Sequence, residues 1–449
     1  MGSWPELRET RTIQAKSATG AVIRCSLTDM MLSDLSVSVI FFYDQTPDID
    51  RLADGLARAF EQVPLFAGRL RTSGNRLELV CDGSGISMPV YDVDESLDEA
   101  IARATLPGSG YVDHVDAPKV APDGLPLLSI RVNRLNDGGM VLGCSWQHSA
   151  GDMQSFMLLM HSWSAAVEGL QLPETVILDD PDSHFDNVLP AEDSGRPGFR
   201  LLDEAETALV QAEFGRAMRT NRTLQIYFSD GELARMKEQL SELAGRWLST
   251  NDALCGLVLS TLRQLDEDAE AREMAMPVNI RKLLELPPDA IGNLVNEVFL
   301  KIRGESSPQS TALQIREAIE NFAGGHLNLR ANAVYLDGVE PSQVSNYIPI
   351  GFDPSRKTFT VTNWSRFGIY DVAFDGHRPV FFCPAANLQL PWIGWLAEGF
   401  DGTGIVLTIT VPGGLVAKLR SNEGRAALHQ YRDPDEQLPA RVGAARKVV

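Results

Sequence analysis

Apolar residues along the chain recur with two different periods, one typical of strands and one typical of helices. Leu35 to Tyr43 (LSVSVIFFY) is rich in β-branched and aromatic residues, which predicts a strand. From Ile49 to Phe60 the apolar residues recur at helical spacing, which predicts a helix. The same rules predict strands at Arg76 to Val80 and Gly85 to Val90, and a short helix at Ser96 to Ala104.

The clearest local prediction is a hairpin that leads into a helix. Leu127 to Leu135 and Met140 to Gln147 are apolar runs, and the residues between them, Asn136 to Gly139 (NDGG), tolerate positive φ. From Asp152 to Gly169 the spacing changes to that of one apolar helix face. His148 therefore lies where a predicted strand becomes a predicted helix.

The second half of the chain repeats this mixture of elements. Predicted strands are Leu224–Phe228, Met274–Asn279, Phe359–Asn363, Val380–Cys383 and Gly404–Val411, and predicted helices are Asp230–Leu243, Ser249–Leu265 and Leu415–Leu428. Leu178 to Pro197 has no period and is rich in Asp, Pro, Ser and Gly, which predicts a crossover. We expect an N-terminal domain over 1–195, completed by part of 362–395, a crossover over 196–221 and a C-terminal domain over 222–449.

Composition and charge exclude several classes of partner. The 449 residues are 44% hydrophobic, so the chain can bury a large core. Forty Lys and Arg against sixty Asp and Glu leave a net charge of −20, which repels nucleic acid and anionic membranes. We expect neither as a partner.

The spacing of the cysteines and the start of the chain indicate which stabilising sites and which cellular compartment to expect. The five Cys are scattered and form no CxxC pair, so we expect neither a disulfide framework nor a metal site. The start of the chain has no apolar core of a signal peptide, and no stretch approaches the roughly 18 apolar residues of a membrane span. We expect a cytosolic, cytoplasmic protein whose charged tail beyond Tyr431 is loose.

The candidate chemistry lies in HSAGD, His148 to Asp152, which fits the pattern HxxxD. The pattern alone is weak, because His429 to Asp433 fits it too. We set the second match aside, since no strand precedes it and no apolar helix follows it. An imidazole at a strand end beside a Gly-containing turn can face a cavity and stay rigid, and its ordinary pKa of about 6.5 suits proton transfer.

Two interpretations of His148 stay open on these residues alone: a general base, or a core histidine satisfied by hydrogen bonds. The sequence has no GxSxG elbow, Walker loop, HExxH or glycine fingerprint after a strand. Acyl transfer from a thioester needs a base, an oxyanion donor and correct positioning, and no nucleophilic Ser or Cys. A lone base is the simplest chemistry that the sequence favours.

With HxxxD in this context, the chain resembles the BAHD acyltransferases, whose signature is HxxxD plus a DFGWG motif. The resemblance spans nearly the whole chain, and its segments follow one another in the expected order: VPLFAGRLR (Val63–Arg71), the hairpin ending in HSAGD, STNDALCGLVL (Ser249–Leu259), PVNIR (Pro277–Arg281), GN (Gly292-Asn293) and TNWSRFGIYDVAFDGHRP (Thr362–Pro379). The last segment departs from the family motif: Ala373 replaces Asp, Asp375 replaces Gly, and Gly376 and His377 replace Trp and Gly. The chain is thus similar to a divergent member with a degenerate motif.

The resemblance implies an α/β fold of two similar-sized chloramphenicol-acetyltransferase-like domains, each a mixed sheet flanked by helices, with an active-site tunnel at their interface. It implies a monomer in which acyl-CoA is the co-substrate, with no permanently bound cofactor. His148 would be the general base that deprotonates a hydroxyl or amine of a small-molecule acceptor of specialised metabolism. Asp152 and Arg281 would form an ion pair that holds the histidine turn in shape.

Further site residues follow from the same resemblance. Thr362 and Trp364 match positions near the reacting centre, where they could bind the oxyanion or the acceptor. Thr250, Arg366 and Arg378 are candidates for coenzyme A binding, which needs local cations or helix N-termini in so acidic a protein. Each has a structural alternative: a helix cap at Thr250, core strand residues at Thr362 and Trp364, and solvated surface for the arginines.

Two other functions stay open. A condensation-type enzyme with carrier-bound acyl donors shares the histidine motif, but it usually carries a second His and a Gly where this chain has Gln147 and Met153. A catalytically inactive scaffold would bind a small molecule in the old tunnel. The altered DFGWG segment keeps that interpretation open, while the retained His148 and Asp152 oppose it.

Overall fold

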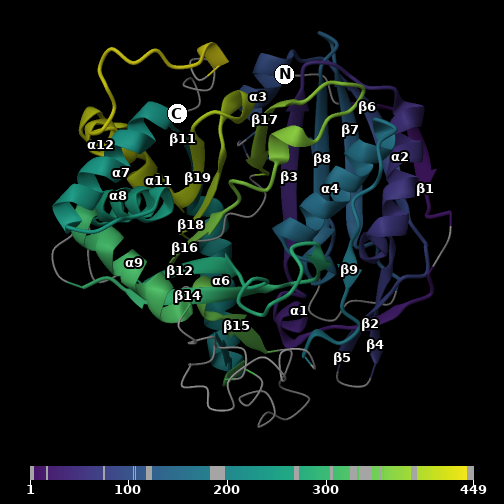
Figure 1. Ribbon diagram of the computed structural model, residues 1–449, viewed down its shortest axis with the longest axis horizontal. Helices are drawn as coiled ribbons and strands as arrows, with labels where there is room; N and C mark the ends of the chain where they lie inside the picture. The colour runs from purple at the N-terminus through teal and green to yellow at the C-terminus, as the bar shows by residue number, and fades with distance from the viewer. Residues whose placement is uncertain are drawn as a thin grey trace. The chain divides into compact units, whose positions relative to one another are not determined.

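The computed structural model describes residues 5–16, 19–73, 76–104, 106, 108–117, 124–182, 198–266, 273–303, 307–323, 331–332, 346–353, 356, 358–385 and 392–441. It divides into two compact units. Unit 1 comprises 1–189, 279–295 and 366–387, and unit 2 comprises 190–278, 296–365 and 388–449. Each unit is a mixed sheet with helices, which confirms the predicted α/β class (Figure 1).

Unit 1 is built on a six-stranded sheet in the order β1-β6-β7-β8-β3-β17. These strands are β1 (Glu6–Ile13), β6 (Ile86–Val93), β7 (Leu128–Leu135), β8 (Met140–Gln147), β3 (Ser36–Tyr43) and β17 (Pro379–Pro384). Only β6 and β7 run parallel within it. All eight residues of β8 are buried, as expected for a central strand that is covered on both faces.

The predicted hairpin is confirmed, because β7 and β8 pair antiparallel with Leu128 opposite Trp146. Helices α2 (Ile49–Gln62) and α4 (Met153–Val167) pack against each other and cover one face of the sheet (Figure 1). The Trp146 ring of β8 stacks on Phe156 of α4, with ring centres 4.1 Å apart. The strand that ends at His148 and the helix that follows therefore share one core.

Small elements complete unit 1. A three-stranded sheet joins β2 (Val22–Arg24), β5 (Arg76–Val80) and β4 (Arg69–Ser73), and the short helices are α1 (Leu27–Met31) and α3 (Leu97–Arg103). The pair β9 (Val176–Ile177) and β13 (Ala290–Ile291) is parallel. This pairing attaches the segment 279–295, which the sequence-based boundaries had left in the C-terminal domain, to unit 1.

Unit 2 has its own six-stranded sheet in the order β11-β19-β18-β16-β12-β14. These strands are β11 (Asn221–Phe228), β19 (Ile405–Pro412), β18 (Ile393–Glu398), β16 (Phe359–Asn363), β12 (Glu273–Asn279) and β14 (Val295–Lys301). Its helices include α7 (Asp230–Ala244), α8 (Thr250–Leu265) and α9 (Pro308–Ala323). α8 and α9 approach so closely that a Cβ on Gly256 would lie 2.7 Å from the Ala312 Cβ, so glycine is required there.

Several elements differ from the sequence prediction. The expected crossover over 196–221 contains β10 (Phe199–Leu201), paired with β15 (Tyr347–Pro349), and the long helix α6 (Glu204–Thr220). Only Ala217 of α6 is buried, so no apolar stripe marked this helix. The single helix expected over Leu415–Leu428 is two helices, α11 (Gly413–Arg420) and α12 (Asn422–Leu428), because Ser421 accepts a hydrogen bond from the Gly424 amide and starts a new helix.

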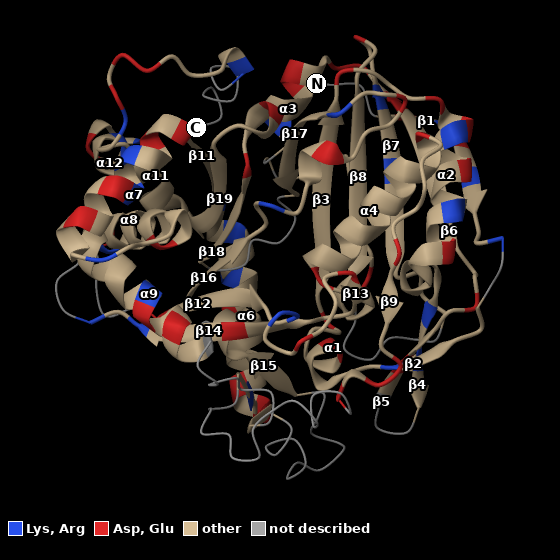
Figure 2. Ribbon diagram, viewed as in Figure 1, with Lys and Arg blue, Asp and Glu red and all other residues tan. Residues whose placement is uncertain are grey.

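The charge distribution agrees with this packing. Figure 2 shows Lys, Arg, Asp and Glu mainly on helices and loops, whereas β3, β8 and β19 carry none. No helix in the described ranges is long and apolar enough to cross a membrane.

The segment after Tyr431, which was expected to be loose, is held at Glu436, whose carboxylate pairs with Arg235 at 2.5 Å.

Candidate active site

His148 opens a short 3-10 turn between β8 and α4, and several hydrogen bonds hold this turn in place. The His148 amide donates to the Leu35 carbonyl at 2.9 Å, which ties the turn to the segment before β3. The Gln147 side chain donates to the Ser33 carbonyl and accepts from the Ser149 amide, each at 2.7 Å. The backbone that carries the imidazole is therefore fixed from two sides.

Gly151 and Asp152 make the change from turn to helix. Gly151 has φ 150°, and a Cβ there would lie 2.6 Å from the Ser155 Cβ, so only glycine fits. The Asp152 side chain accepts from the Ser155 amide at 2.9 Å and caps α4. The local structure thus explains two residues of HSAGD: Gly151 is required by the backbone conformation, and Asp152 caps α4.

The His148 imidazole is held by Asn293. Nδ1 of His148 lies 2.9 Å from Oδ1 of Asn293, and Nδ2 of Asn293 lies 2.6 Å from the His148 carbonyl oxygen. Nδ2 also lies 2.7 Å from the carboxylate Oδ1 of Asp29. Two acceptors around one atom identify it as the amide nitrogen, so the other amide atom is an acceptor. His148 Nδ1 must then carry the proton, and the lone pair is on Nε2.

The pKa of His148 also indicates a neutral imidazole. Burial lowers its pKa below the ordinary value of 6.5, while the Asn293 hydrogen bond partly opposes that change. The side chain is only partly exposed. At neutral pH the imidazole is therefore uncharged, and Nε2 can accept a proton.

Asp152 and Arg281 form a buried ion pair beside this turn. Nη1 of Arg281 lies 2.8 Å and Nη2 3.0 Å from the two Asp152 carboxylate oxygens. Both side chains are no more than 4% exposed. Asp152 also accepts from the Leu294 amide at 3.1 Å, and Arg281 donates to the Ala290 carbonyl at 2.8 Å. The structure thus brings together His148, Asp152 and Arg281, all within unit 1.

Sequence reasoning missed two residues of this cluster, Asn293 and Asp29. Neither was singled out: Asn293 stood out only as part of the GN pair, and Asp29 only as part of LTDMMLSDL (Leu27–Leu35), a further segment that resembles the family. Asn293 is 145 residues from His148 in the chain, and an uncharged amide carries no chemical signature. The sequence signals that could have drawn attention to them are the GN pair itself and an acidic residue in the LTDMM segment.

Three predicted residues belong to unit 2. Thr250 is the first residue of α8, and Ser249, not Thr250, accepts the capping hydrogen bond from Asp252. Thr362 lies on β16 and is partly exposed. Trp364 follows β16, is 6% exposed and lies with its ring centre 6.4 Å from that of Trp395.

The two predicted arginines are exposed and belong to unit 1. Arg366 adopts a positive φ of 75°. Arg378 pairs with Asp371 at 3.1 Å, and both side chains are about two-thirds exposed, at 67% and 66%. Arg378 thus has the exposed ion pair of an ordinary surface residue.

The altered DFGWG segment is anchored to unit 1. Phe374 is fully buried against Trp163 and Tyr43, with ring centres 4.8 and 5.6 Å away. Ser164 donates to the Ala373 carbonyl at 2.7 Å, a contact that any residue at 373 could make. Asp375 has φ 53° and accepts from the Asp48 amide at 2.8 Å. The segment keeps a structural role with different side chains.

Two of the buried cysteines are unsuited to act as nucleophiles, and the described residues form no metal-binding group. All five cysteines are buried and none forms a disulfide, and burial raises the pKa of Cys81 to about 11 and that of Cys144, on β8, well above its ordinary value. A thiolate at neutral pH is therefore disfavoured at both. Within the described ranges no group of three or more His, Cys, Asp or Glu is placed to hold a metal ion.

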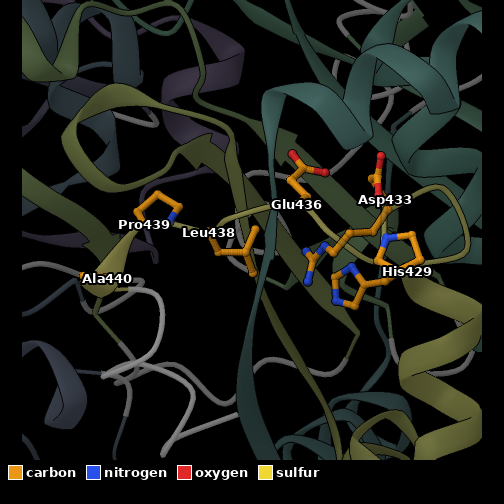
Figure 3. A pocket seen from close by; sticks show the side chains of 8 residues that line it. His429, Asp433, Glu436, Leu438, Pro439 and Ala440 are labelled. Atoms are coloured by element: carbon orange, nitrogen blue, oxygen red, sulfur yellow. The ribbon is translucent and has the colours of Figure 1, made fainter.

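The second HxxxD match lies at a different place in the fold. His429, Arg432 and Asp433 help to line a cavity of about 530 Å³ in unit 2 (Figure 3). His429 Nδ1 lies 2.9 Å from Oε1 of Glu232, and Arg432 Nε donates to Oε2 of Glu232 at 2.8 Å. Glu232 is fully buried in α7. His429 therefore pairs with a buried carboxylate and fastens the C-terminal segment to α7.

Comparison with known proteins decides the family. The model of the Transferase family matches residues 6–422. The chain belongs to this family, the BAHD acyltransferases. It is 23% identical over 422 residues to epi-neemfruitin B synthase L1AT of Melia azedarach, covering 89% of this chain and 92% of that protein.

Two solved structures of similar fold also match this BAHD chain. Vinorine synthase matches with a TM-score of 0.68 and 17% identity, over 94% of this chain and 98% of the other. TRI101 of F. sporotrichioides, solved with coenzyme A and T-2, matches with a TM-score of 0.70 and 16% identity, over 90% and 98%. Membership of this family identifies the chain as an acyltransferase.

Proposed function

We propose that His148 is the general base of this acyltransferase and that Nε2 is the atom that takes the proton. The observation that supports this proposal is the 2.9 Å contact between His148 Nδ1 and Asn293 Oδ1, because it requires the proton to be on Nδ1. Burial keeps the imidazole uncharged at neutral pH, as a base must be. These features favour a base over a core histidine satisfied on both nitrogens.

The reaction proceeds in two steps. Nε2 of His148 takes the proton of an acceptor hydroxyl or amine as its oxygen or nitrogen bonds to the thioester carbonyl carbon, and the carbonyl electrons move to oxygen. The tetrahedral intermediate then collapses, the carbon–sulfur bond breaks, and the Nε2 proton passes to the departing thiolate. The products are an ester or amide and free coenzyme A, and His148 returns to its starting state.

The other predicted residues have supporting roles in this proposal. Asp152 and Arg281 hold the turn that carries His148, supported by their buried contact at 2.8 Å. Thr362 and Trp364 contact the acceptor or the developing oxyanion. Coenzyme A is the co-substrate, and Arg366, Arg378 and the α8 start at Thr250 are the candidates for its phosphates. Thr250 at a helix N-terminus has the stronger physical basis, because that end carries partial positive charge.

The acceptor is a small molecule of specialised metabolism. The names of relatives support this class: shikimate O-hydroxycinnamoyltransferase of Nicotiana tabacum is named for transfer to oxygen, and anthranilate N-benzoyltransferase protein 2 of Dianthus caryophyllus for transfer to nitrogen. We further propose a cytoplasmic monomer that needs no nucleic acid, membrane or permanently bound cofactor.

The test measures free coenzyme A thiol released by purified protein from a panel of aliphatic and aromatic acyl-CoAs with pooled alcohols and amines. Acceptor-dependent release should fall on the order of 10²-fold or more in His148→Ala, the contribution typical of general-base catalysis. His377→Ala is the matched control, because His377 is a 40% exposed histidine of unit 1. Its turnover should equal that of the wild type.

Two results would overturn the proposal. Full activity in a folded His148→Ala variant would exclude the general-base role. No release by the wild type from any donor would favour the remaining alternatives, a condensation-type enzyme with carrier-bound donors or an inactive scaffold. Supplying the same acyl groups on a carrier-protein thioester separates those two.

A further inference from the structure

Asp29 lies behind Asn293, on the side away from the imidazole. It belongs to α1 and is only 5% exposed. Its Oδ1 accepts from Asn293 Nδ2 at 2.7 Å, and its Oδ2 accepts from the Ser26 amide at 2.6 Å. Its carbonyl oxygen also accepts from the Ser149 hydroxyl at 2.9 Å, one residue after His148. Asp29 thus contacts the histidine turn through its backbone and Asn293 through its side chain.

The orientation of the Asn293 amide decides the state of His148. In the observed orientation the amide oxygen faces Nδ1 of His148, so Nδ1 is protonated and Nε2 is a base. A flipped amide would present its NH2 group to Nδ1, and the imidazole would then carry its proton on Nε2. Such an imidazole could not take a proton from the acceptor, although its position would be unchanged.

Two acceptors oppose that flip, the His148 carbonyl at 2.6 Å and the Asp29 carboxylate, which when ionised can only accept hydrogen bonds. Flipping Asn293 would turn its oxygen toward Oδ1 of Asp29, two acceptors 2.7 Å apart. Burial raises the pKa of Asp29 to about 6, partly offset by hydrogen bonds from Asn293 and Ser26, so it is still ionised at neutral pH. Asp29 is therefore an ionised carboxylate at a buried position that disfavours the ionised form.

We propose that Asp29 is a positioning residue, whose carboxylate fixes the Asn293 amide and thereby keeps the proton of His148 on Nδ1. The inference rests on the proposed role of His148 as the base. The Asp29 carboxylate contacts Asn293 and not the imidazole, so its effect on the proton position passes through Asn293.

A purely structural role makes a different prediction. Asp29 and Ser26 form a capping box at the start of α1, and either residue could matter only for that helix. Ser26→Ala is the matched control, since it removes the acceptor of the Asp29 amide at 3.1 Å and leaves the Asp29–Asn293 contact intact. A capping role predicts similar effects of Ser26→Ala and Asp29→Asn on every measurement.

The experiment measures which ring nitrogen of His148 carries the proton, using full-length protein with 15N in the histidine rings. Long-range 1H–15N correlation distinguishes a protonated from an unprotonated ring nitrogen, and the His148 signals are those absent from His148→Gln. The wild type and Ser26→Ala should show protonated Nδ1 and unprotonated Nε2. Asp29→Asn and Asp29→Ala should show a mixture with protonated Nε2, with kcat lower by about tenfold to a hundredfold and KM unchanged.

A second arm restores the arrangement with the groups exchanged. Combining Asp29→Asn with Asn293→Asp places the acceptor-only carboxylate next to His148 Nδ1 and the amide behind it. A carboxylate at 293 accepts from Nδ1 in either orientation, so this double variant should return the proton to Nδ1 although its other oxygen faces the His148 carbonyl, and a structural role would not predict that return. The inference is overturned if folded Asp29→Asn and Asp29→Ala keep the wild-type proton position. The ring signals need no turnover, so an inactive wild type would count against the proposed function alone.

Discussion

Replacing Asp152 with alanine removes a carboxylate that accepts hydrogen bonds from three residues. Arg281 donates to it at 2.8 and 3.0 Å, Ser155 at 2.9 and 3.0 Å, and the Leu294 amide at 3.1 Å. Arg281 is 3% exposed and would stay charged with no anion beside it. Removing one partner of such a buried pair costs about 3–5 kcal/mol, and the lost cap of α4 costs about 1 kcal/mol more.

These two contributions share one carboxylate, so they are not additive, and we expect a total of about 3–5 kcal/mol. Domains are typically stable by about 5–15 kcal/mol, so the change removes a large part of the stability of unit 1. The unfolding midpoint should fall by roughly 10 °C, because about 1 kcal/mol corresponds to 2–4 °C in a domain of 150–250 residues.

The assay is urea and thermal unfolding followed by fluorescence and circular dichroism, with turnover measured on the same samples. Asp371→Ala is the control, because its partner Arg378 is exposed and such pairs contribute about 0–1 kcal/mol. Asp152→Ala should destabilise far more than Asp371→Ala and lose turnover together with the fold. A normal midpoint and normal turnover in Asp152→Asn would refute the structural role of the pair.

The buried His148 and Glu232 give the remaining predictions. The acidic limb of the kcat/KM profile should have its midpoint below pH 6.5, because burial lowers the pKa of His148, and a midpoint above 6.5 would contradict the burial argument. The same shift predicts that stability falls as pH drops from 6.5 toward the folded pKa, since the unfolded chain then binds the additional proton; His148→Gln should lose this part of the pH dependence. Glu232→Ala should destabilise unit 2 by about 3 kcal/mol, because it leaves Arg432 and His429 without their buried carboxylate, and turnover at low temperature should stay normal. Loss of turnover in a folded Glu232→Ala variant would mean that the C-terminal cavity serves the reaction.

Local patterns predicted the elements whose burial follows a simple period. The β7–β8 hairpin and the α4 helix were visible because their apolar residues recur with the period of each element. The α6 helix was missed because it buries only Ala217 and thus shows no apolar stripe. The sequence pattern placed the segment 279–295 with the C-terminal half, whereas the segment belongs to unit 1 by its contacts. These contacts, the β9–β13 pair and the side chains of Arg281 and Asn293, join residues far apart in the chain and leave no local pattern.

The sequence by itself determined the class of chemistry, since HSAGD at a strand-to-helix change, together with the segments shared with BAHD enzymes, marked His148 as the candidate base. Only the tertiary structure decided which nitrogen of His148 is the base, because that depends on Asn293 and, behind it, on Asp29. These residues are 145 and 264 positions from the groups they contact. Hydrogen-bond direction between such distant groups depends on atomic positions in the folded chain, and no local period of apolar residues encodes it.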